Sequence, residues 1–250
     1  MAREVSDVWM PVVDGISFDE WKKEMDIRAG RVNIEEPQEG AAVRYFVGLD
    51  FGKLQDYSAV SIVEQRLAPS GTAHYFVKHI RRFPLILRYI EVAKALKKMD
   101  QQLQGYAAAK GKEAVITWIC DCTGVGEGVA DILEKVMPES DIVKCYITGG
   151  ISPTIDFEMR EVRLPKSQLI STLVALFDSK RINLTKRSKE IDDMLDELAN
   201  FEIHVSEETG RDSYGAKSGT HDDLLVSLAL ACWAAELAAE EGAFEPLRMW

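Results

Sequence analysis

Apolar residues first recur in a regular pattern between about residue 43 and residue 82. Three runs rich in β-branched and aromatic residues, at about 43–51, 58–65 and 73–82, are separated by short polar turns. Runs of this length with short turns between them are typical of strands joined by hairpins. We therefore expect three consecutive antiparallel strands at the start of a domain.

The next segment alternates helical and strand patterns. From Pro84 to Leu103 apolar residues recur every three or four positions, which predicts a helix. The run AVITWICD at 114–121 predicts a fourth strand, followed by a helix over 129–137 and a fifth strand at 141–147. Crossover helices of this kind connect parallel strands, so the predicted fold class is α/β, with a mixed five-stranded sheet flanked by helices.

The remainder of the chain predicts elements that surround this sheet. Leu169, Leu173 and Leu176 share one face of a helix, and the final helix is apolar around most of its circumference, so we expect it to be buried. In order, the pattern predicts a polar loop at 149–165, the helix around 169–177, a short strand at 182–184, a charged helix at 188–200, an extra β-hairpin with a polar tip at 201–220, and the final helix opening at Thr220.

Residues 1–42 differ from the rest of the chain. They are rich in acidic residues and are interrupted by proline and glycine, so only a short helix around 21–27 is predicted there. We interpret 1–42 as an N-terminal linker or appendage and 43–250 as one domain.

Composition limits the classes of function. A formal net charge of −11 argues against a chain that coats nucleic acid by charge alone, so any nucleic acid must meet a local basic patch. The four cysteines lie within apolar segments rather than in a spaced framework, which indicates reduced thiols. The longest apolar run, at 224–235, is shorter than the roughly 20 residues that span a bilayer, and no signal segment is recognisable, so no membrane partner is expected.

Four aspartates stand where the predicted elements end or begin. Asp50 ends the first strand, Asp121 ends the fourth strand, and Asp222 and Asp223 lie in the first turn of the last helix. If the first and fourth strands are neighbours, these carboxylates converge, and they repel one another unless they are protonated or bind cations. Oxygen ligands suit Mg²⁺ or Mn²⁺ rather than zinc. Two such ions in one site can promote phosphodiester hydrolysis, which makes the aspartates candidate catalytic and metal-binding residues.

Each aspartate also has a simpler interpretation. Asp50 could form a turn before Gly52, and Asp121 could form a local turn at the approach to a helix. Asp223 could complete a helix cap that begins at Thr220, and Asp222 could favour the positive end of the helix dipole. Adjacent helical residues point about 100° apart, so Asp222 and Asp223 are not expected to bind in the same way. The sequence slightly favours Asp223 and leaves the choice open.

Other motifs suggest contacts with phosphate. The glycine-rich turn CTGVGEG lacks the Lys-Ser/Thr pair of a phosphate-binding loop, so close approach of a helix is the better interpretation and no nucleotide cofactor is expected. A local excess of basic residues between 156 and 189 is the best candidate for DNA contact. The DNA-binding candidates are Arg160, Arg163, Lys166, Arg211, Lys217 and His221, with Lys78, Arg81 and Arg82 as secondary candidates.

Three segments together resemble a known family. VGLDFGKLQDYSA, ICDCTGVGEGVADIL and SGTHDDLLVSLALACW are similar to the acidic motifs of the C-terminal nuclease domain of the large terminase subunit of tailed bacteriophages. The resemblance covers roughly residues 43 to 240 and implies a ribonuclease-H-like fold. It implies that Asp50, Asp121 and Asp223, with Asp222 beside them, are the metal ligands, and that the hairpin before His221 faces DNA.

The resemblance also implies a biological setting. The expected activity is a Mg²⁺ or Mn²⁺ dependent endonuclease that cuts double-stranded viral DNA during genome packaging, in the cytoplasm of the infected bacterial host. The expected partners are double-stranded DNA, the packaging ATPase domain, the portal protein and the small terminase subunit. The Walker motifs of a packaging ATPase do not occur in the sequence, so we expect an excised domain or a split gene product. Two alternatives stay open: an ATPase or kinase of the actin and hexokinase superfamily, and a non-catalytic docking module of the packaging motor.

Overall fold

The structure is a computed structural model that describes residues 42–52, 56–184, 188–205, 212–216 and 221–241. Almost all of the expected N-terminal appendage, the tip of the expected hairpin and Thr220 lie outside these residues.

The predicted core strands are present in the predicted order. β1 (Val43–Asp50), β2 (Ala59–Leu67) and β3 (Ala73–Arg82) pair as successive antiparallel strands. β4 (Ala114–Asp121) lies parallel to β1, and β5 (Asp141–Thr148) lies parallel to β4. The α/β class and the mixed five-stranded core are thus as expected, and the carboxyl ends of β1, β4 and β5 lie along one edge of the sheet.

Within the described residues, the sheet has eight strands rather than five, in the order β6-β7-β5-β4-β1-β2-β3-β8. β8 (Ile182–Leu184) is the predicted short strand and pairs with β3. The expectation of a polar loop at 149–165 is wrong, because β6 (Thr154–Asp156) and β7 (Glu161–Pro165) form a hairpin there. β7 has only five residues, and its buried Val162 and Leu164 alternate with the charged Glu161 and Arg163, so its apolar signal is too short to stand out in the sequence.

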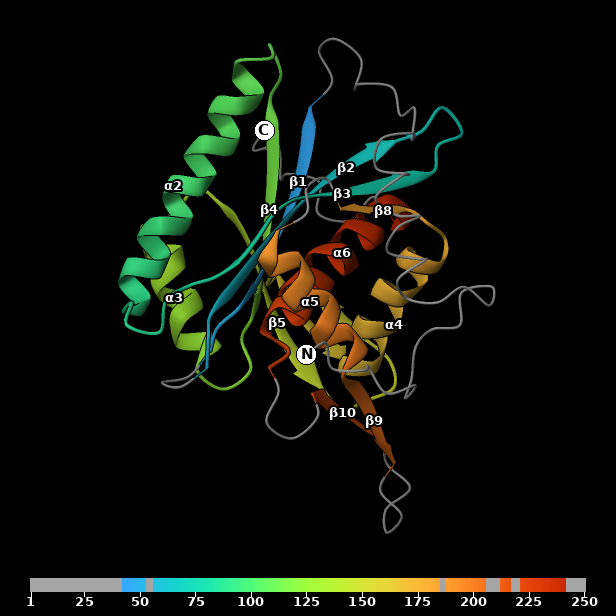
Figure 1. The fold of residues 1–250 in the computed structure, drawn as a ribbon. Helices are drawn as coiled ribbons and strands as arrows, with labels where there is room; N and C mark the ends of the chain where they lie inside the picture. Colours follow the sequence, from blue (N-terminus) through green and yellow to red (C-terminus); the bar gives the residue numbers. More distant parts are fainter. Residues whose placement is uncertain (1–41, 53–55, 185–187, 206–211, 217–220, 242–250) are drawn as a thin grey trace.

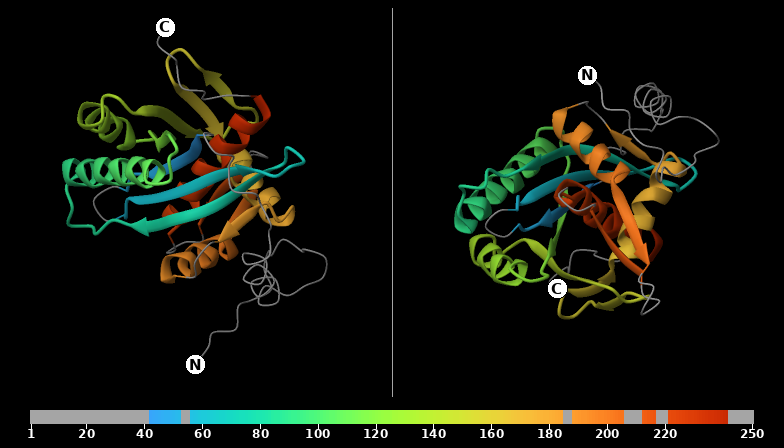
Figure 2. Two further views of the ribbon diagram at one scale, coloured as in Figure 1. Left: turned by 90° about the horizontal axis from the view of Figure 1, so that it is seen from above. Right: turned by 60° about the horizontal axis from the view of Figure 1, so that its bottom comes forward.

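Two layers of helices cover the sheet (Figures 1 and 2). One face carries α2 (Tyr89–Ala108) and α3 (Gly126–Val136). The other face carries α4 (Lys166–Asp178), α5 (Lys189–Ala199) and α6 (Asp223–Glu241). α2 begins five residues after Pro84, because the chain first makes a turn at 85–86, closed by a hydrogen bond from the Leu87 amide to the Pro84 carbonyl, and Arg88 is extended. Among the helices that the structure describes, none is long and apolar enough to cross a membrane.

The extra hairpin is also present. β9 (Phe201–Val205) and β10 (Asp212–Ala216) pair as a separate antiparallel ribbon between α5 and α6. It projects from one end of the molecule, at the bottom of Figure 1.

A very close backbone contact lies where α6 crosses β1 at Gly48. A Cβ atom on Gly48 would lie 1.9 Å from the carbonyl oxygen of Ser227 and 2.7 Å from the amide nitrogen of Ala231, both in α6. On the neighbouring strand, the Ser61 hydroxyl lies 2.8 Å from the Ser227 hydroxyl, so the two buried groups form a hydrogen bond. Glycine therefore allows backbone-to-backbone packing that sets the distance between the last helix and the central strand.

We expect Gly48→Ala to lower the free energy of unfolding by about 3 kcal/mol or more, because the added methyl group would press α6 away from β1. Gly105→Ala is the matched control: a Cβ there meets no atom within 4 Å, and the change in α2 should stabilise by roughly 0.5–1 kcal/mol. Urea unfolding followed by circular dichroism measures both. Equal stabilities for the two variants would contradict the proposed contact.

Candidate metal centre

The parallel pairing of β1 and β4 places two carboxylates side by side. Leu49 pairs with Cys120, so the next residues, Asp50 and Asp121, leave the sheet together at its carboxyl edge. Asp222 and Asp223 arrive at the same edge because α6 packs across β1 and begins there. A cleft of about 610 Å³ is lined by Asp50, Asp222 and Asp223, with the backbone of 123–125 and the side chains of Tyr57 and His221 around them.

The acid groups influence each other's ionisation. Burial raises the pKa of Asp50 well above its ordinary value, and the charges of Asp121, Asp222 and Asp223 raise it further. Burial likewise raises the pKa of Asp121, against a hydrogen bond of 2.8 Å from the Thr123 amide that favours the ionised form. All four predicted aspartates are therefore close enough to interact.

Two of the four carboxylates already have a cation as partner. The Lys166 ammonium group donates to Asp222 Oδ2 at 2.7 Å. Arg82 donates bidentate hydrogen bonds to Asp223. Its Nε lies 3.0 Å from Oδ1 and 2.9 Å from Oδ2, and its Nη2 lies 2.9 Å from Oδ1. Within the described residues, no three His, Cys, Asp or Glu side chains are grouped so that they could hold a metal ion as they stand. Carboxylates engaged in this way have to turn before they share an ion.

Arg82 joins three elements at the edge of the cleft. Besides Asp223 it binds Glu197 through Nη2, and its Nη1 lies 3.3 Å from Asp193, both on α5. Glu197 in turn accepts a hydrogen bond of 2.8 Å from the Leu225 amide in α6. Burial, with a further contribution from Asp223, raises the pKa of Glu197 to about 8. Arg82 thus links the end of β3 to α5 and to the start of α6.

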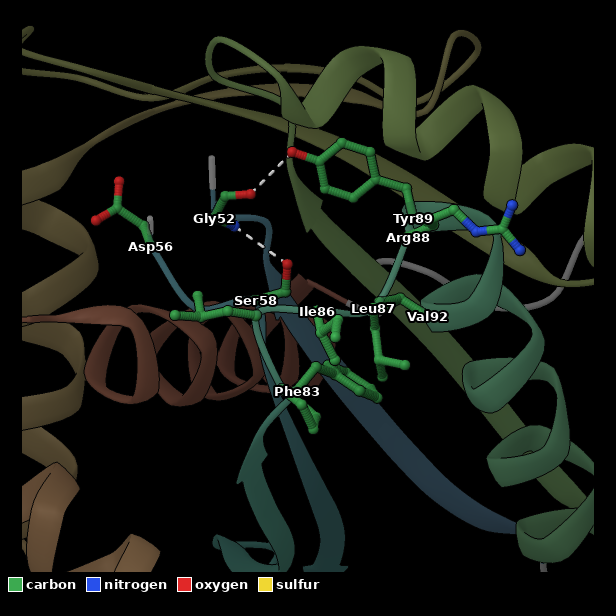
Figure 3. Close-up of a pocket in the computed structure, with 11 residues that line it drawn as sticks. Gly52, Asp56, Ser58, Phe83, Ile86, Leu87, Arg88, Tyr89 and Val92 are labelled. Atoms are coloured by element: carbon green, nitrogen blue, oxygen red, sulfur yellow. Dashed lines mark hydrogen bonds between the residues drawn. The ribbon is translucent and has the colours of Figure 1, made fainter. Parts of the chain in front are cut away.

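A second pocket, of about 330 Å³, lies beside the cleft and shares Gly52 and Asp56 with it (Figure 3). The Tyr89 hydroxyl donates to the Gly52 carbonyl at 3.0 Å, and the Gly52 amide donates to the Ser58 hydroxyl at 3.2 Å. These bonds fix the chain two residues after Asp50, so its carboxylate is presented from a rigid strand end.

The glycine-rich turn after β4 behaves as the sequence indicates. A Cβ on Gly126 would lie 1.8 Å from the Asp121 carbonyl oxygen, so α3 starts in direct contact with the end of β4. The glycine at position 126 lets α3 pack closely against the end of β4. In the same turn, the Thr123 amide donates a hydrogen bond to the Asp121 carboxylate.

Comparisons with known proteins agree with this geometry. A family model described as the terminase RNaseH-like domain matches residues 47–234, which is most of the chain. The chain belongs to this terminase family. Comparison with curated proteins finds no significant match.

Two solved structures show how widely this terminase fold is shared. The magnesium-bound large terminase nuclease of the thermophilic phage G20c is 24% identical, with a TM-score of 0.51 over 81% of this chain and 85% of that one. The manganese-soaked terminase nuclease domain of human cytomegalovirus is 12% identical, with a TM-score of 0.53 over 88% of this chain and 95% of that one. At these identities the likeness establishes the ribonuclease-H-like fold of the terminase nuclease domain.

The residues predicted to contact DNA lie at different places on this terminase domain. His221 lines the cleft, with its ring 5.7 Å from that of Tyr57 in an edge-to-face arrangement. Lys166 follows the carboxyl end of β7 and reaches the aspartates, whereas Arg160 precedes β7 and binds Asp141 at the opposite edge of the sheet. Arg163 lies on β7 with its guanidinium 5.2 Å from the centre of the Tyr146 ring. Two further candidates, Arg211 and Lys217, lie outside the described residues.

Sequence reasoning missed two acidic residues of the site and misread one basic residue. Asp56 lines the cleft six positions after Asp50, and Glu197 binds Arg82 and the Leu225 amide from a helix that was predicted only as charged. Glu197 stands three positions after the buried Met194 and one before the buried Leu198, so helical spacing alone could have marked it as inward. Arg82, a secondary phosphate-binding candidate, is instead bound to carboxylates of the protein.

We expect Arg82→Gln to lower the free energy of unfolding by about 3 kcal/mol, because it leaves the buried carboxylate of Asp223 without its cation and removes a hydrogen bond to Glu197. Arg88→Gln is the matched control, since Arg88 is 78% exposed and its ion pair with Glu91 should contribute less than about 1 kcal/mol. Urea titrations at neutral pH with EDTA compare them. Similar losses in both variants would show that the Arg82 network contributes little.

We expect the metal-free protein to lose stability through Asp50 as the pH rises. The unfolded carboxyl group ionises near 3.8, whereas the folded one keeps its proton to higher pH, so between these values only the folded state binds the proton. Asp50→Asn should therefore match the parent near pH 4 and exceed its stability at pH 8 by more than about 1.4 kcal/mol, the equivalent of one pKa unit.

Unfolding in EDTA at pH 4, 6 and 8 tests the ionisation of Asp50. Asp131→Asn, which changes a half-exposed aspartate on α3, is the control and should keep the slope of the parent protein. If Asp50→Asn changes the free energy of unfolding by the same amount at all three pH values, the pKa of Asp50 is not raised in the folded protein.

Proposed function

We propose that this terminase nuclease domain is a Mg²⁺ or Mn²⁺ dependent endonuclease that cuts double-stranded viral DNA during genome packaging. The observation that carries the proposal is that Asp50, Asp222 and Asp223 line one cleft, while Asp121 ends the strand parallel to that of Asp50 and lies close enough to raise its pKa. Two ions at this site are the proposed cofactors. The magnesium-bound phage nuclease and the manganese-soaked viral nuclease are metal-bound relatives of the same fold, which supports this choice of ions.

The donor set fits a hard divalent cation. Asp50 and Asp121 stand on rigid strand ends and provide oxygen ligands in a cleft open to solvent, and Asp222 or Asp223 would complete the set from α6. When bound, such ions activate water and stabilise the leaving oxygen of a phosphodiester. The Thr123 amide keeps Asp121 oriented, while Arg82 and Lys166 hold the two helix-borne aspartates at the rim. His221 and Tyr57 form the wall beside which the scissile strand would lie.

We further propose that DNA crosses the carboxyl edge of the sheet, where Lys166, His221 and the hairpin of β9 and β10 are located. Arg163 is a proposed contact to the DNA backbone, and so are Arg211 and Lys217, which lie outside the described residues. Arg160 is the least favoured, since it lies at the other edge. With a net charge of −11 the isolated domain should bind DNA weakly, so attachment to a packaging motor would provide the effective concentration. The proposed motor partners are the packaging ATPase domain, the portal protein and the small terminase subunit, in the cytoplasm of the infected bacterium.

The direct test is nicking and linearisation of supercoiled plasmid in the presence of Mn²⁺. We expect the parent protein to cut, and Asp50→Asn and Asp121→Asn each to reduce the rate at least about 100-fold, because each removes a charged metal ligand. Asp131→Asn is the control for a carboxylate outside the cleft and should cut at the parental rate.

Three outcomes separate the proposal from its alternatives. Equal cutting by the Asp50, Asp121 and Asp131 variants would make the site assignment wrong. Tight ATP binding without DNA cleavage would favour a kinase-like or ATPase function. Absence of any metal-dependent cleavage, combined with binding to portal or ATPase proteins, would favour a docking module.

A further inference from the structure

Lys166 lies beside the aspartates of the cleft and forms an ion pair with one of them. It is the first residue of α4 and directly follows β7, whose carboxyl end lies on the same sheet edge as the ends of β1 and β4. Its ammonium group donates to Asp222 at 2.7 Å, and both side chains are about three-quarters buried, with 23% and 26% of their surface exposed. Its charge also lowers the pKa of Asp50 and of Asp121. One ammonium group therefore compensates three of the four carboxylates.

We propose that Lys166 is an internal counter-ion that holds the acidic cleft together when no metal is present and is displaced when a divalent cation binds. Lys166 is in this sense a positioning residue that competes with the metal for the same carboxylates. The inference deepens the proposed function and rests on it, because the competing ions are those of the proposed nuclease.

The surroundings of Lys166 distinguish it from the other cation of the cleft. Arg82 is tied to Asp223, Glu197 and Asp193 at once, so moving it would leave three carboxylates on two helices without a partner. In the part of the chain that the structure describes, the Lys166 ammonium group has one carboxylate partner, and it lies 5.5 Å from the centre of the Phe201 ring. An aromatic face attracts an ammonium group, so the Lys166 side chain can stay against the Phe201 ring after it leaves Asp222. Lys166 is therefore the exchangeable cation and Arg82 the permanent one.

The competition predicts a tighter metal site when the charge is removed. Lys166→Met keeps an unbranched apolar stem but has no ammonium group, and we expect it to lower the dissociation constant for Mn²⁺ at least about tenfold. The Lys166 ammonium group would have to give up its bond of 2.7 Å to Asp222, and charge interactions at such short range near a protein surface are sufficient for such an effect. Lys166→Arg retains the charge and should keep the parental affinity within about threefold. Isothermal titration calorimetry with MnCl₂ on the full chain measures these constants without reference to cleavage.

Thermal unfolding gives an independent readout. In EDTA, Lys166→Met should melt below the parent, because the carboxylates repel one another without compensation. In saturating Mn²⁺ the variant should gain more in melting temperature than the parent gains, since stabilisation grows with affinity. Lys166→Gln serves as a second neutral variant in case the methionine variant does not fold.

Lys144→Met is the matched control. Lys144 is 19% exposed and is paired with Asp131 at 3.0 Å and Glu134 at 3.2 Å, away from the cleft. It should lower the melting temperature in EDTA but leave the Mn²⁺ dissociation constant unchanged. This control separates the loss of an ion pair in general from competition with the metal.

Mn²⁺ binding by the parent protein separates failure of the Lys166 proposal from failure of the proposed nuclease function. Mn²⁺ binding by the parent with unchanged or weaker binding by the neutral Lys166 variants would overturn the counter-ion role and leave the nuclease proposal standing. Absence of Mn²⁺ binding in the parent and the variants alike would overturn both. Tighter binding by the neutral variants, with parental affinity in Lys166→Arg and Lys144→Met, supports the counter-ion role.

Discussion

The contact between α6 and β1 at Gly48 is the constraint on which the site depends. Because the helix backbone lies directly on the strand, the start of α6 cannot shift without moving the whole buried helix. Parallel pairing of β1 with β4 then determines that Asp50 and Asp121 emerge together, and the seated helix adds Asp222 and Asp223. Packing in an apolar core thus brings together charges that would otherwise separate.

Bringing four carboxylates together costs free energy, and the fold offsets part of that cost with cations from other elements. Arg82 comes from the end of β3 and Lys166 from the end of β7, so opposite sides of the sheet contribute one cation each. The raised pKa of Asp50 shows that the compensation is incomplete. An acidic cleft with residual repulsion is stabilised by any ligand that adds positive charge, which is the physical basis for the proposed binding of divalent ions there.

Much of this organisation could be predicted from the sequence, for identifiable reasons. Long apolar runs such as those ending at Asp50 and Asp121 define strands, and a crossover helix requires them to lie parallel. The β6 and β7 hairpin was missed because these strands have three and five residues, and two apolar side chains among charged ones leave little signal in β7. The partner of Arg82 could not be foreseen, because Asp223 lies 141 residues away and the pairing depends on how β3, α5 and α6 meet in space. Sequence patterns therefore located the ligands of the proposed site but not the groups that restrain them.

Asp222 and Asp223 are restrained in different ways by their cation partners. Asp223 is 6% exposed and fixed by a two-pronged bond to Arg82, which is itself anchored on α5. Such a carboxylate is well positioned, and the lone pairs that the guanidinium leaves unused can still face an ion. Asp222 is more exposed and bound to a single flexible lysine, so it can turn further when a cation enters. The geometry therefore favours different roles for the two residues, with Asp223 as the preorganised ligand and Asp222 as the one whose position depends on the charge present in the cleft.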